Sequence, residues 1–264
     1  MTRRVQRWSA TIALVVGIGL AVAPAVFQMF TRAPLGGTMI DDFQPYMRQQ
    51  TIDEFRVYMS DIDAATAEAA ALRLQMVAAG SLTADQYDTT YAGVKTLTTD
   101  WATIDADMCD LLDRMDANMG NYAAVAALPP FPLFPWFFVL PGLMVAAVAG
   151  SILWATRDGS TRSPRRRLWA LAGLGVAIIA APVAFQMFTR APKAGEMIDS
   201  FRPMMTRERV QNVQRYFITL GGAEGQLRVG AIPAYVAGGG DATDYPGIAA
   251  WSAQWPTIVS DFNR

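Results

Sequence analysis

Three long apolar stretches without a charged residue are the feature that most constrains how this chain can fold. They lie at roughly Trp8–Phe30, Phe134–Ala155 and Leu168–Phe188. A helix of about 20 residues, rising 1.5 Å per residue, crosses the hydrocarbon core of a bilayer. Inside a bilayer every backbone N–H and C=O must be paired within the segment. Each stretch is therefore predicted to be a transmembrane helix.

The first stretch also has features of a secretory signal peptide, because Arg3, Arg4 and Arg7 precede it and Ala-Val-Ala follows at 21–23. Two observations argue against cleavage. Pro24 would stand directly after the cut, where it is unfavourable. A near copy of the segment also lies inside the chain, where a signal peptide does not function. The first stretch is therefore predicted to be retained as a membrane span.

The eight residues FQMFTRAP occur twice, at Phe27–Pro34 and at Phe185–Pro192, which is an offset of 158 residues. Eight consecutive matches are not expected by chance. The similarity continues at the same or a nearly equal offset in three further places: Pro24 with Pro182, Met39–Asp41 with Met197–Asp199, and WATIDAD from Trp101 with WPTIVSD from Trp255. The sequence therefore predicts a duplicated unit made of a span and the outer segment that follows it.

The second copy is shorter than the first. Arg264 aligns with Asp110, which in the first copy is followed by more helix and then by the second span. Two interpretations remain open: a protein with three spans, or a shortened form of a four-span protein whose fourth transmembrane helix would follow Arg264.

Arginines set the expected orientation of the spans. Three stand at the N-terminus, and the segment 156–167 contains Arg157, Arg162 and Arg165–Arg167 against Asp158 alone. Cytoplasmic loops carry such an excess of arginine and lysine. The N-terminus is therefore predicted to be cytoplasmic and the C-terminus extracytoplasmic, in the plasma (inner) membrane. The outer segment 31–131 has 6 basic and 15 acidic residues, a net charge of −9, which agrees with this orientation.

The predicted organisation is all-α, with three transmembrane helices and an extracytoplasmic helical-hairpin bundle. The segments are a first transmembrane helix at 1–30, an extracytoplasmic hairpin at 31–131, a second transmembrane helix at 132–155, a cytoplasmic Arg-rich loop at 156–167, a third transmembrane helix at 168–188, and a second, degenerate hairpin at 189–264. Two hairpins pairing would give a four-helix bundle.

The first hairpin is predicted from apolar residues that recur every three or four positions, the period of one helix face. The two faces are Ile52, Phe55, Met59, Ile62, Ala65, Ala69, Leu72 and Met76, then Tyr87, Tyr91, Val94, Leu97, Trp101, Ile104, Met108, Leu111 and Met115. Gly80 is expected to end the first helix. Thr83 and Gln86 form the pattern of a capping box at the start of the second, and Gly120 is expected to end it. In the second copy, the glycine-rich runs GGAEGQ and GGGDATDYPG are predicted to be loops.

The repeated motif is expected at the outer membrane surface. Arg32 and Arg190 can reach lipid phosphates there, and the proline of each motif is expected to end the helix or redirect the chain. Two interpretations remain: interfacial anchoring, or a paired site for an anionic lipid. The run NYAAVAALPPFPLFPWFFVLPG places Trp136 and Phe137 in an aromatic belt at the same surface. Its prolines predict an extended, non-helical approach to the second span.

Small residues repeat every four positions along the spans, a pattern that lets transmembrane helices approach closely. Gly142, Ala146 and Gly150 form one such stripe, and Gly17 and Gly173 each begin another. They are predicted to pack helices together, either within this chain or with another subunit.

The sequence offers few groups for catalysis. Histidine is absent and Cys109 is the single cysteine. The acidic run from Asp100 to Asp116 spreads around a helix and lacks the spacing of a calcium loop, so it is interpreted as a solvated face. The run GGGDATDYPG lacks the ending of a phosphate-binding loop. We therefore expect no enzyme, no cofactor, no metal site and no nucleic-acid partner.

The aromatic and proline-rich stretch Asn121–Gly142, together with the general plan, resembles uncharacterised multi-pass membrane proteins of actinobacteria, including mycobacteria. The resemblance implies a cell-envelope location and supplies no catalytic residues. The predicted function is an accessory or scaffold subunit of a larger envelope complex, of transporter or respiratory type, in contact with lipids and other membrane subunits. The alternative is an extracytoplasmic ligand or lipid sensor whose input domain is the helical bundle.

Overall fold

The computed structural model describes residues 3–157 and 164–262 of the 264-residue chain. Helices make up 88% of the described residues, which contain no strand. The prediction of an all-α protein is therefore confirmed. Of the Arg-rich loop predicted at 156–167, residues 158–163 lie outside the described residues, and the two ends are helical, in α6 and α7.

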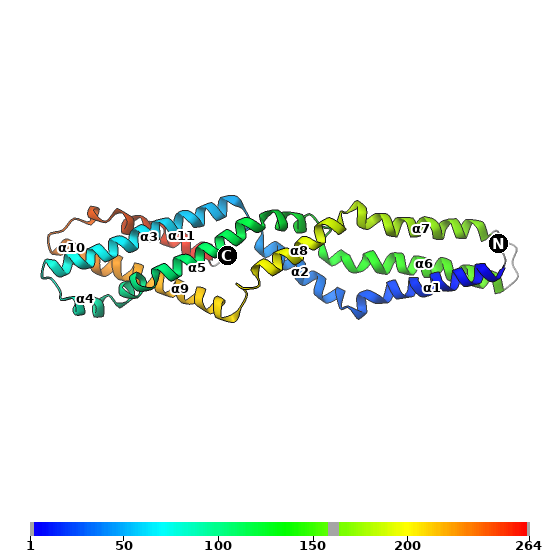
Figure 1. The fold of residues 1–264 in the computed structure, drawn as a ribbon, viewed down its shortest axis with the longest axis horizontal. Helices are drawn as coiled ribbons and strands as arrows, with labels where there is room; N and C mark the ends of the chain where they lie inside the picture. Colours follow the sequence, from blue (N-terminus) through cyan, green and yellow to red (C-terminus); the bar gives the residue numbers. More distant parts are fainter. Residues whose placement is uncertain (1–2, 158–163, 263–264) are drawn as a thin grey trace. The chain divides into compact units, whose positions relative to one another are not determined.

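The chain divides into two compact units (Figure 1). The apolar unit comprises Met1–Pro45 and Gly120–Met197, and the bundle unit comprises Tyr46–Met119 and Ile198–Arg264. The apolar unit contains α1 (Arg3–Val26), α2 (Met29–Phe43), η1 (Phe131–Leu133), α6 (Phe134–Arg157), α7 (Pro164–Ala184) and most of α8 (Met187–Phe201). The bundle unit contains α3 (Gln49–Ala78), α4 (Ala84–Thr90), most of α5 (Ala92–Ala126), α9 (Arg207–Gln226), η2 (Leu227–Ala231), α10 (Ile232–Ala237), η3 (Ala242–Asp244) and α11 (Pro246–Phe262).

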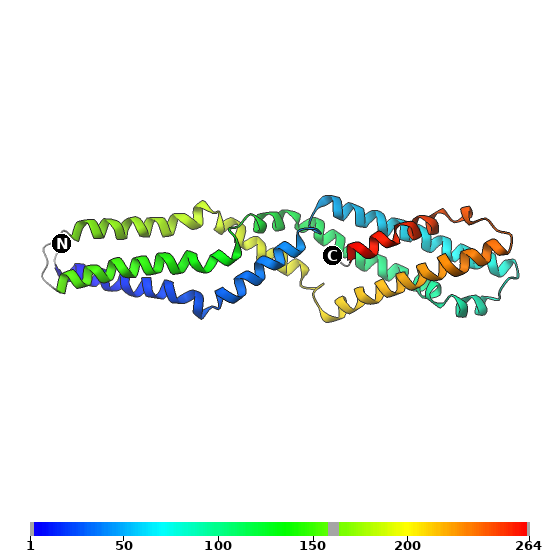
Figure 2. The same ribbon diagram turned by 180° about the vertical axis from the view of Figure 1, so that it is seen from behind.

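Three helices of the apolar unit are long and apolar enough to cross a membrane. The candidate spans are Arg4–Val26, Phe131–Arg157 and Arg166–Ala184. They correspond to the three stretches predicted from the sequence and indicate a membrane protein. Helices α1 and α6 run side by side in both views (Figure 1, Figure 2).

The first and third spans end four residues earlier than predicted. Helix α1 ends at Val26 and α7 at Ala184, and in each case a glutamine follows in the left-handed region, Gln28 with φ 55° and Gln186 with φ 53°. Pro34 lies inside α2 and does not end a helix, so that prediction was wrong. The chain is redirected at Gln28, after Pro24 has removed one backbone donor from the last turns of α1.

Replacing Gln28 with glycine is expected to stabilise the apolar unit by about 0.5–1 kcal/mol. A left-handed φ strains any residue with a Cβ, and glycine adopts it without strain. The midpoint of unfolding in detergent measures the effect. Gln44 is the matched control because its φ of −54° is right-handed. Glycine at position 44 is expected to be neutral or destabilising, and a loss of stability in Gln28→Gly would contradict the strain argument.

The bundle unit is a four-helix bundle of α3, α5, α9 and α11. Seven of the eight residues predicted for the first face are buried on α3, and Phe55 is half-buried. On α4 and α5 the buried set matches the prediction up to Ile104 and again at Met115. Between them Leu112 is buried while Leu111 and Met108 are half-buried, so this part of the predicted face was displaced by one position.

The predicted turn between the first two bundle helices is confirmed. Gly80 has φ +72°, its N–H bonds to the carbonyl of Val77, and the N–H of Ser81 bonds to that of Met76. This pair of bonds is the Schellman pattern that closes a helix at glycine. Thr83 and Gln86 form both bonds of a capping box at the start of α4.

The second bundle helix differs from the prediction at two places. It is interrupted at Tyr91, where φ is −114° and ψ is 49°, so that α4 and α5 are separate. It also continues past Gly120 to Ala126. An exposed glycine destabilises a helix by only about 1 kcal/mol, which the flanking helical residues outweigh.

The run GGAEGQ is helical, so the prediction of a loop was wrong. It forms the end of α9 and is followed by a π-helical turn, η2, and by α10. A Cβ at Gly221 would lie 3.0 Å from the ring of Trp255, so this glycine allows α9 to approach α11. The second glycine-rich run contains a turn, with Gly239 at φ +97°, and the short η3.

The proline-rich approach to the second span is only partly extended. Residues 127–130 are non-helical, as predicted, but Phe131–Leu133 forms a 3₁₀ turn. Pro135 lies in the first turn of α6, where a missing N–H costs no helical bond.

Candidate functional site

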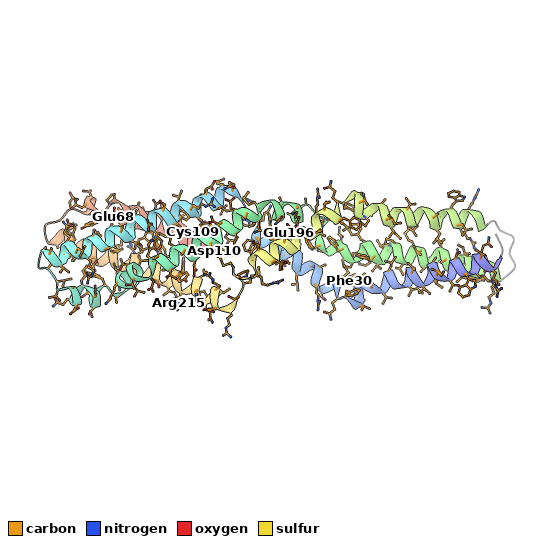
Figure 3. All side chains as sticks on the ribbon, viewed as in Figure 1. Phe30, Glu68, Cys109, Asp110, Glu196 and Arg215 are labelled. Carbon is orange, nitrogen blue, oxygen red and sulfur yellow. The ribbon has the colours of Figure 1, made fainter. Side chains whose placement is uncertain are left out.

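The aromatic entrance to α6 holds both copies of the repeated motif. Phe30 lies edge-on to Trp136 with ring centroids 5.7 Å apart, and Phe185 lies edge-on to Phe137 at 5.5 Å. The first aromatic pair joins α2 to α6, and the second joins the end of α7 to α6. Figure 3 labels Phe30 on the ribbon of the apolar unit. Trp136 and Phe137 therefore hold the chain that follows the first and third spans; Trp136 is also exposed, whereas Phe137 is half-buried.

The two motif arginines have different surroundings. Arg190 donates from Nη1 to the carbonyl oxygen of Ala127 at 2.7 Å, just beyond the C-terminus of α5. A guanidinium at that place satisfies a free carbonyl and complements the helix dipole. Arg32 is exposed on α2. The structure thus does not bring Arg32 and Arg190 into equivalent environments, although the sequence around them is identical.

The predicted small-residue stripes divide into a packed and an open set. A Cβ added to Gly142 would lie 2.6 Å from the backbone nitrogen of Ala21 and 2.7 Å from the carbonyl oxygen of Gly17. A Cβ on Gly17 would lie 2.7 Å from the backbone nitrogen of Ala146. Gly17, Gly142 and Ala146 are therefore brought together where α1 meets α6, and only glycine fits at the contact.

Gly150 and Gly173 form the open set: nothing lies within 4 Å of a Cβ placed on either residue. The 158-residue offset pairs Gly17 with Gly175 instead of Gly173, and it pairs Ala21 with the much larger Ile179. Along α7, none of the residues in the most apolar window is buried. The side of α7 that carries Gly173, Ala177 and Ala181 is therefore open.

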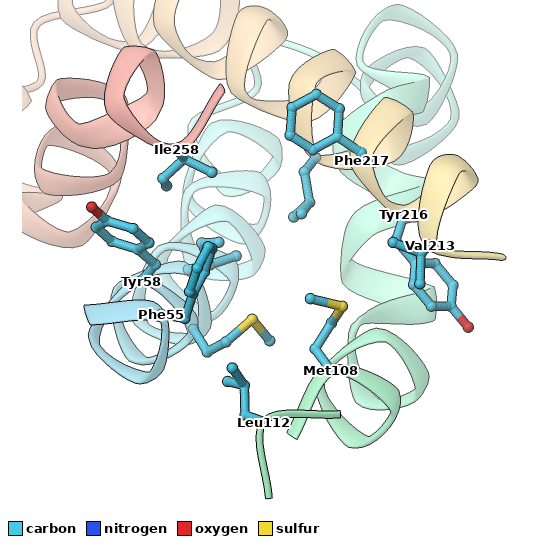
Figure 4. Close-up of a pocket in the computed structure, with 11 residues that line it drawn as sticks. Phe55, Tyr58, Met108, Leu112, Val213, Tyr216, Phe217 and Ile258 are labelled. Atoms are coloured by element: carbon cyan, nitrogen blue, oxygen red, sulfur yellow. The ribbon is translucent and has the colours of Figure 1, made fainter. Parts of the chain in front are cut away.

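The interior of the bundle unit contains a small apolar cavity (Figure 4). Its volume is about 30 Å³. All four bundle helices line it, through residues that include Phe55, Met59, Met108, Phe217 and Ile258. An apolar cavity needs about 150 Å³ to hold a molecule the size of benzene. The cavity is therefore a packing defect and not a ready binding site.

Filling that cavity is expected to stabilise the bundle. Val213 lines it, and Val213→Ile adds one methylene group, which contributes about 0.8 kcal/mol when buried. Thermal unfolding of the full chain in detergent measures the gain. Val210→Ile on the same helix is the control, since Val210 is exposed and no change is expected there. A loss of more than about 1 kcal/mol in Val213→Ile would mean that the cavity cannot accept the group.

The acidic run on α5 is used mainly in contacts within the bundle. Asp107 accepts a hydrogen bond from Tyr216 at 2.6 Å and forms an ion pair with Arg209, both on α9. Asp113 and Asp116 each accept from Nη2 of Arg56 on α3 at 3.0 Å. The interpretation of the whole run as a solvated face was therefore wrong for Asp107. Among the described residues, no group of three or more acidic or cysteine side chains is placed to hold a metal ion.

The Asp107 contact predicts a pH dependence of stability. Burial alone would raise the pKa of Asp107, but the bonds from Tyr216 and Arg209 outweigh burial and lower the pKa below 3.8. The carboxylate therefore stabilises the fold at any pH above the pKa that Asp107 has in the unfolded chain. This contribution is lost as the pH falls through the lower pKa of the folded chain. At pH 7, Asp107→Asn is expected to lower the free energy of unfolding by about 1 kcal/mol, which thermal melting measures. The stabilities of the two chains should converge as the pH falls through the lowered pKa of Asp107; a gap that stays constant with pH would refute the assignment.

Cys109 is half-buried on α5, and its thiol lies 3.5 Å from Oδ1 of Asp105. Burial raises the pKa of this thiol, and the nearby carboxylates raise it further. The thiolate is therefore disfavoured, which is unsuited to nucleophilic chemistry.

Two side chains that the sequence did not single out hold the bundle together. Gln226 accepts from the N–H groups of Gly93 at 2.8 Å and Val94 at 3.2 Å, and so caps α5 after the break at Tyr91. Glu68 of α3 accepts from Gly247 and Ile248, both at 2.9 Å, and caps α11. Their partners lie more than 130 residues away in the chain, so no local pattern identifies them.

Comparison of the chain with models of protein families, with curated proteins and with solved structures found no match. Inference about function therefore depends on the residues and geometry of this chain.

Proposed function

We propose that this chain is a non-enzymatic accessory or scaffold subunit of a larger membrane complex of the cell envelope, of transporter or respiratory type. The open side of α7 carries the proposal. None of the residues in its apolar window is buried, and nothing stands within 4 Å of a Cβ at Gly173. Helix α1, by contrast, is packed against α6 through Gly17 and Gly142. An open side with small residues suits pairing with a helix of another subunit.

The orientation that we propose is an N-terminus in the cytoplasm and a C-terminus outside, in a multi-pass protein of the plasma membrane. The arginine-rich ends of the spans support it. Arg7 of α1 donates to the carbonyl of Thr156 at 2.9 Å, and Arg167 of α7 donates to that of Ser151 at 2.7 Å. Arginines of α1 and α7 thus lie against the last two turns of α6, which itself ends at Arg157, as expected for a cytoplasmic side. The bundle unit is then extracytoplasmic.

We also propose that the chain arose by duplication of a span and its outer segment. Equal backbone geometry at Gln28 and Gln186 supports this. So do the matching hydrogen bonds from Thr31 to Gln28 and from Thr189 to Gln186, both 2.9 Å. The resemblance of Asn121–Gly142 to actinobacterial membrane proteins agrees with an envelope location and lipid contact.

The sensor alternative has less support. A ligand sensor needs an enclosed cavity for its ligand, and the cavity between the four bundle helices holds about 30 Å³, whereas the two larger hollows of the bundle unit, of about 220 and 320 Å³, are open at its surface. The first of these volumes accommodates roughly two water molecules.

The test is purification of the tagged full-length protein from its native membrane in gentle detergent, with quantitative mass spectrometry. A membrane protein recovered in a fixed ratio is expected. Ala177→Leu fills the open side of α7 and should lower the recovery of the co-purifying protein about tenfold. A loss of roughly 1.4 kcal/mol in binding free energy has that effect. Ala172→Leu, an equal change on another side of α7, should leave the recovery unchanged. Recovery of a lone monomer or homodimer would overturn the proposal.

A further inference from the structure

Each of the three spans exposes a tryptophan close to one end. Trp8 of α1 is 68% exposed, Trp154 of α6 is 72% exposed and Trp169 of α7 is 69% exposed. Tryptophan is highly buried on average, and its apolar ring with one N–H donor suits it to the membrane–water interface. Three such exposures therefore indicate a surface that meets a partly apolar layer and not water alone.

An exposed arginine accompanies each tryptophan, one helical turn nearer to the end of the span. The pairs are Arg4 with Trp8, Trp154 with Arg157, and Arg166 with Trp169. Residues three or four apart lie on the same side of a helix. We call these residues the arginine–tryptophan pairs. The 158-residue offset of the repeated motif does not explain them, because it places Arg166 opposite Trp8.

The three pairs lie at one end of the apolar unit. Arg7 donates to the carbonyl of Thr156 at 2.9 Å, and Arg167 donates to that of Ser151 at 2.7 Å. These bonds hold the start of α1 and the start of α7 against the last turns of α6, and both views show the three helix ends together (Figure 1, Figure 2). The pairs are therefore at a similar depth, with the arginines beyond the tryptophans.

That depth agrees with the thickness of a bilayer. Trp136, at the other end of α6, is exposed and lies 18 residues before Trp154. At 1.5 Å per residue the two tryptophans are about 27 Å apart along the helix, close to the roughly 30 Å of the hydrocarbon core. Each end of α6 thus carries an indole where a headgroup layer begins.

The arginines beside the pairs have few carboxylates to neutralise them. The N-terminus and the segment 156–167 together contain eight arginines and one acidic residue, Asp158. The described residues of α1, α6 and α7 include no aspartate or glutamate. Cations gathered without counter-charges attract anions. For residues at this depth, the nearest anions are the phosphates of lipid headgroups.

The opposite end of the apolar unit differs in charge. There Arg190 donates to the carbonyl of Ala127, and Lys193 forms an ion pair with Glu196 at 2.7 Å. Helix α2 adds two exposed aspartates. The excess of positive charge therefore belongs to the end that carries the arginine–tryptophan pairs.

We propose that the arginine–tryptophan pairs bind the headgroups of anionic phospholipids, which lie in the cytoplasmic leaflet in the orientation proposed above. The arginine of each pair donates to the phosphate, and the indole lies beneath it at the boundary of the hydrocarbon core. The tryptophans favour lipid over a soluble acidic partner, because they lie on the apolar side of the arginines. The inference goes beyond the proposed function and does not depend on the partner subunit.

The test compares two lipids with equal acyl chains and different charge. The purified full-length protein is reconstituted into nanodiscs with equal amounts of dioleoyl phosphatidylglycerol and dioleoyl phosphatidylcholine, and native mass spectrometry counts the lipids that stay bound. Phosphatidylcholine has a phosphate but no net charge, so phosphatidylglycerol is expected to be retained about tenfold more often.

Removal of the three arginines provides the second measurement. Arg4→Gln with Arg157→Gln and Arg166→Gln should reduce the preference to about twofold or less, because each arginine near an anionic surface contributes about fivefold to binding. All three side chains are exposed, so an unchanged circular dichroism spectrum is expected.

The matched control removes the same charge from the bundle unit. Arg48→Gln with Arg207→Gln and Arg215→Gln changes three exposed arginines outside the spans and should keep the preference. Loss of the preference in this control would mean that the net charge of the chain, and not the place of the arginines, determines lipid binding.

The tryptophans have an effect of their own. Trp8→Leu with Trp154→Leu and Trp169→Leu keeps the arginines, so the retention of both lipids should fall while the preference for phosphatidylglycerol remains. Inorganic phosphate in large excess should displace neither lipid, because it lacks the acyl chains beside the spans.

Four results would overturn the inference: equal retention of the two lipids by the natural chain, an unchanged preference in the arginine variant, unchanged retention in the tryptophan variant, or displacement of phosphatidylglycerol by inorganic phosphate. None of these measurements involves a partner subunit. The inference and the proposed function can therefore fail separately.

Discussion

Gly142→Ala is expected to destabilise the pairing of α1 and α6 by about 3 kcal/mol, near the upper end of what overpacking costs. The new Cβ would lie 2.6 Å from the backbone nitrogen of Ala21 and 2.7 Å from the carbonyl oxygen of Gly17. Both atoms belong to the main chain of α1 and have no rotamer by which to move away. The two helices must therefore separate, and the contacts along their whole length weaken.

Gly150→Ala is the matched control for this change. Gly150 lies on the same helix and in the same predicted stripe, but nothing is within 4 Å of its added Cβ. Alanine there should be neutral or stabilise the helix by about 0.5–1 kcal/mol. Reversible unfolding in mixed detergent and SDS measures both variants. Equal effects at 142 and 150 would show that helix propensity, and not the close contact, determines the result.

Features that depend on neighbouring residues could be predicted from the sequence. The three spans follow from length and composition, because a helix pairs all of its backbone groups within one apolar segment of this length. Gly80, Thr83 and Gln86 mark a turn through bonds to residues at most five positions away. The period of the apolar residues on α3 likewise requires no knowledge of the remaining chain.

Features that depend on distant residues could not be predicted. Gly142 and Gly150 have the same local pattern, and only the position of α1 distinguishes them. The run GGAEGQ has the composition of a loop, but Gly221 allows contact with the ring of Trp255, so packing overrides propensity. The break at Tyr91 is stabilised by Gln226, which lies 133 residues beyond Gly93.

The same division holds for the candidate sites. Identical letters around Arg32 and Arg190 left anchoring and a paired lipid site both open, and the difference between the two arginines, of which only Arg190 has the carbonyl of Ala127 beside it, depends on distant residues. The acidic run on α5 could be placed on a helix, but the contact of Asp107 with Tyr216 depends on how α9 packs.

The second large effect is expected at Glu68, which Figure 3 labels on α3. Its two carboxylate oxygens accept from the N–H groups of Gly247 and Ile248, both at 2.9 Å. These donors belong to the first turn of α11 and have no partner within that helix. Hydrogen bonds to a charged group contribute about 1.5–3 kcal/mol each, and the negative charge also complements the helix dipole. Glu68→Ala is therefore expected to cost about 3 kcal/mol or more.

The loss of stability on replacing Glu68 should depend on which atoms the new side chain keeps. Glu68→Gln keeps one acceptor oxygen and loses the charge, so roughly half of the effect is expected. Glu54→Ala is the control on the same helix, because Glu54 is exposed and bonds only to Gln50 among the described contacts; a change below about 0.5 kcal/mol is expected there.

Chemical denaturation of the full chain gives the free energies, and hydrogen exchange at Gly247 and Ile248 reports the cap directly. Without the carboxylate, these two amides should exchange faster while those of α3 remain protected. Unchanged exchange at both amides in Glu68→Ala would mean that α11 is held by its packing on α3 alone, through Trp251 and Ile258 in the core.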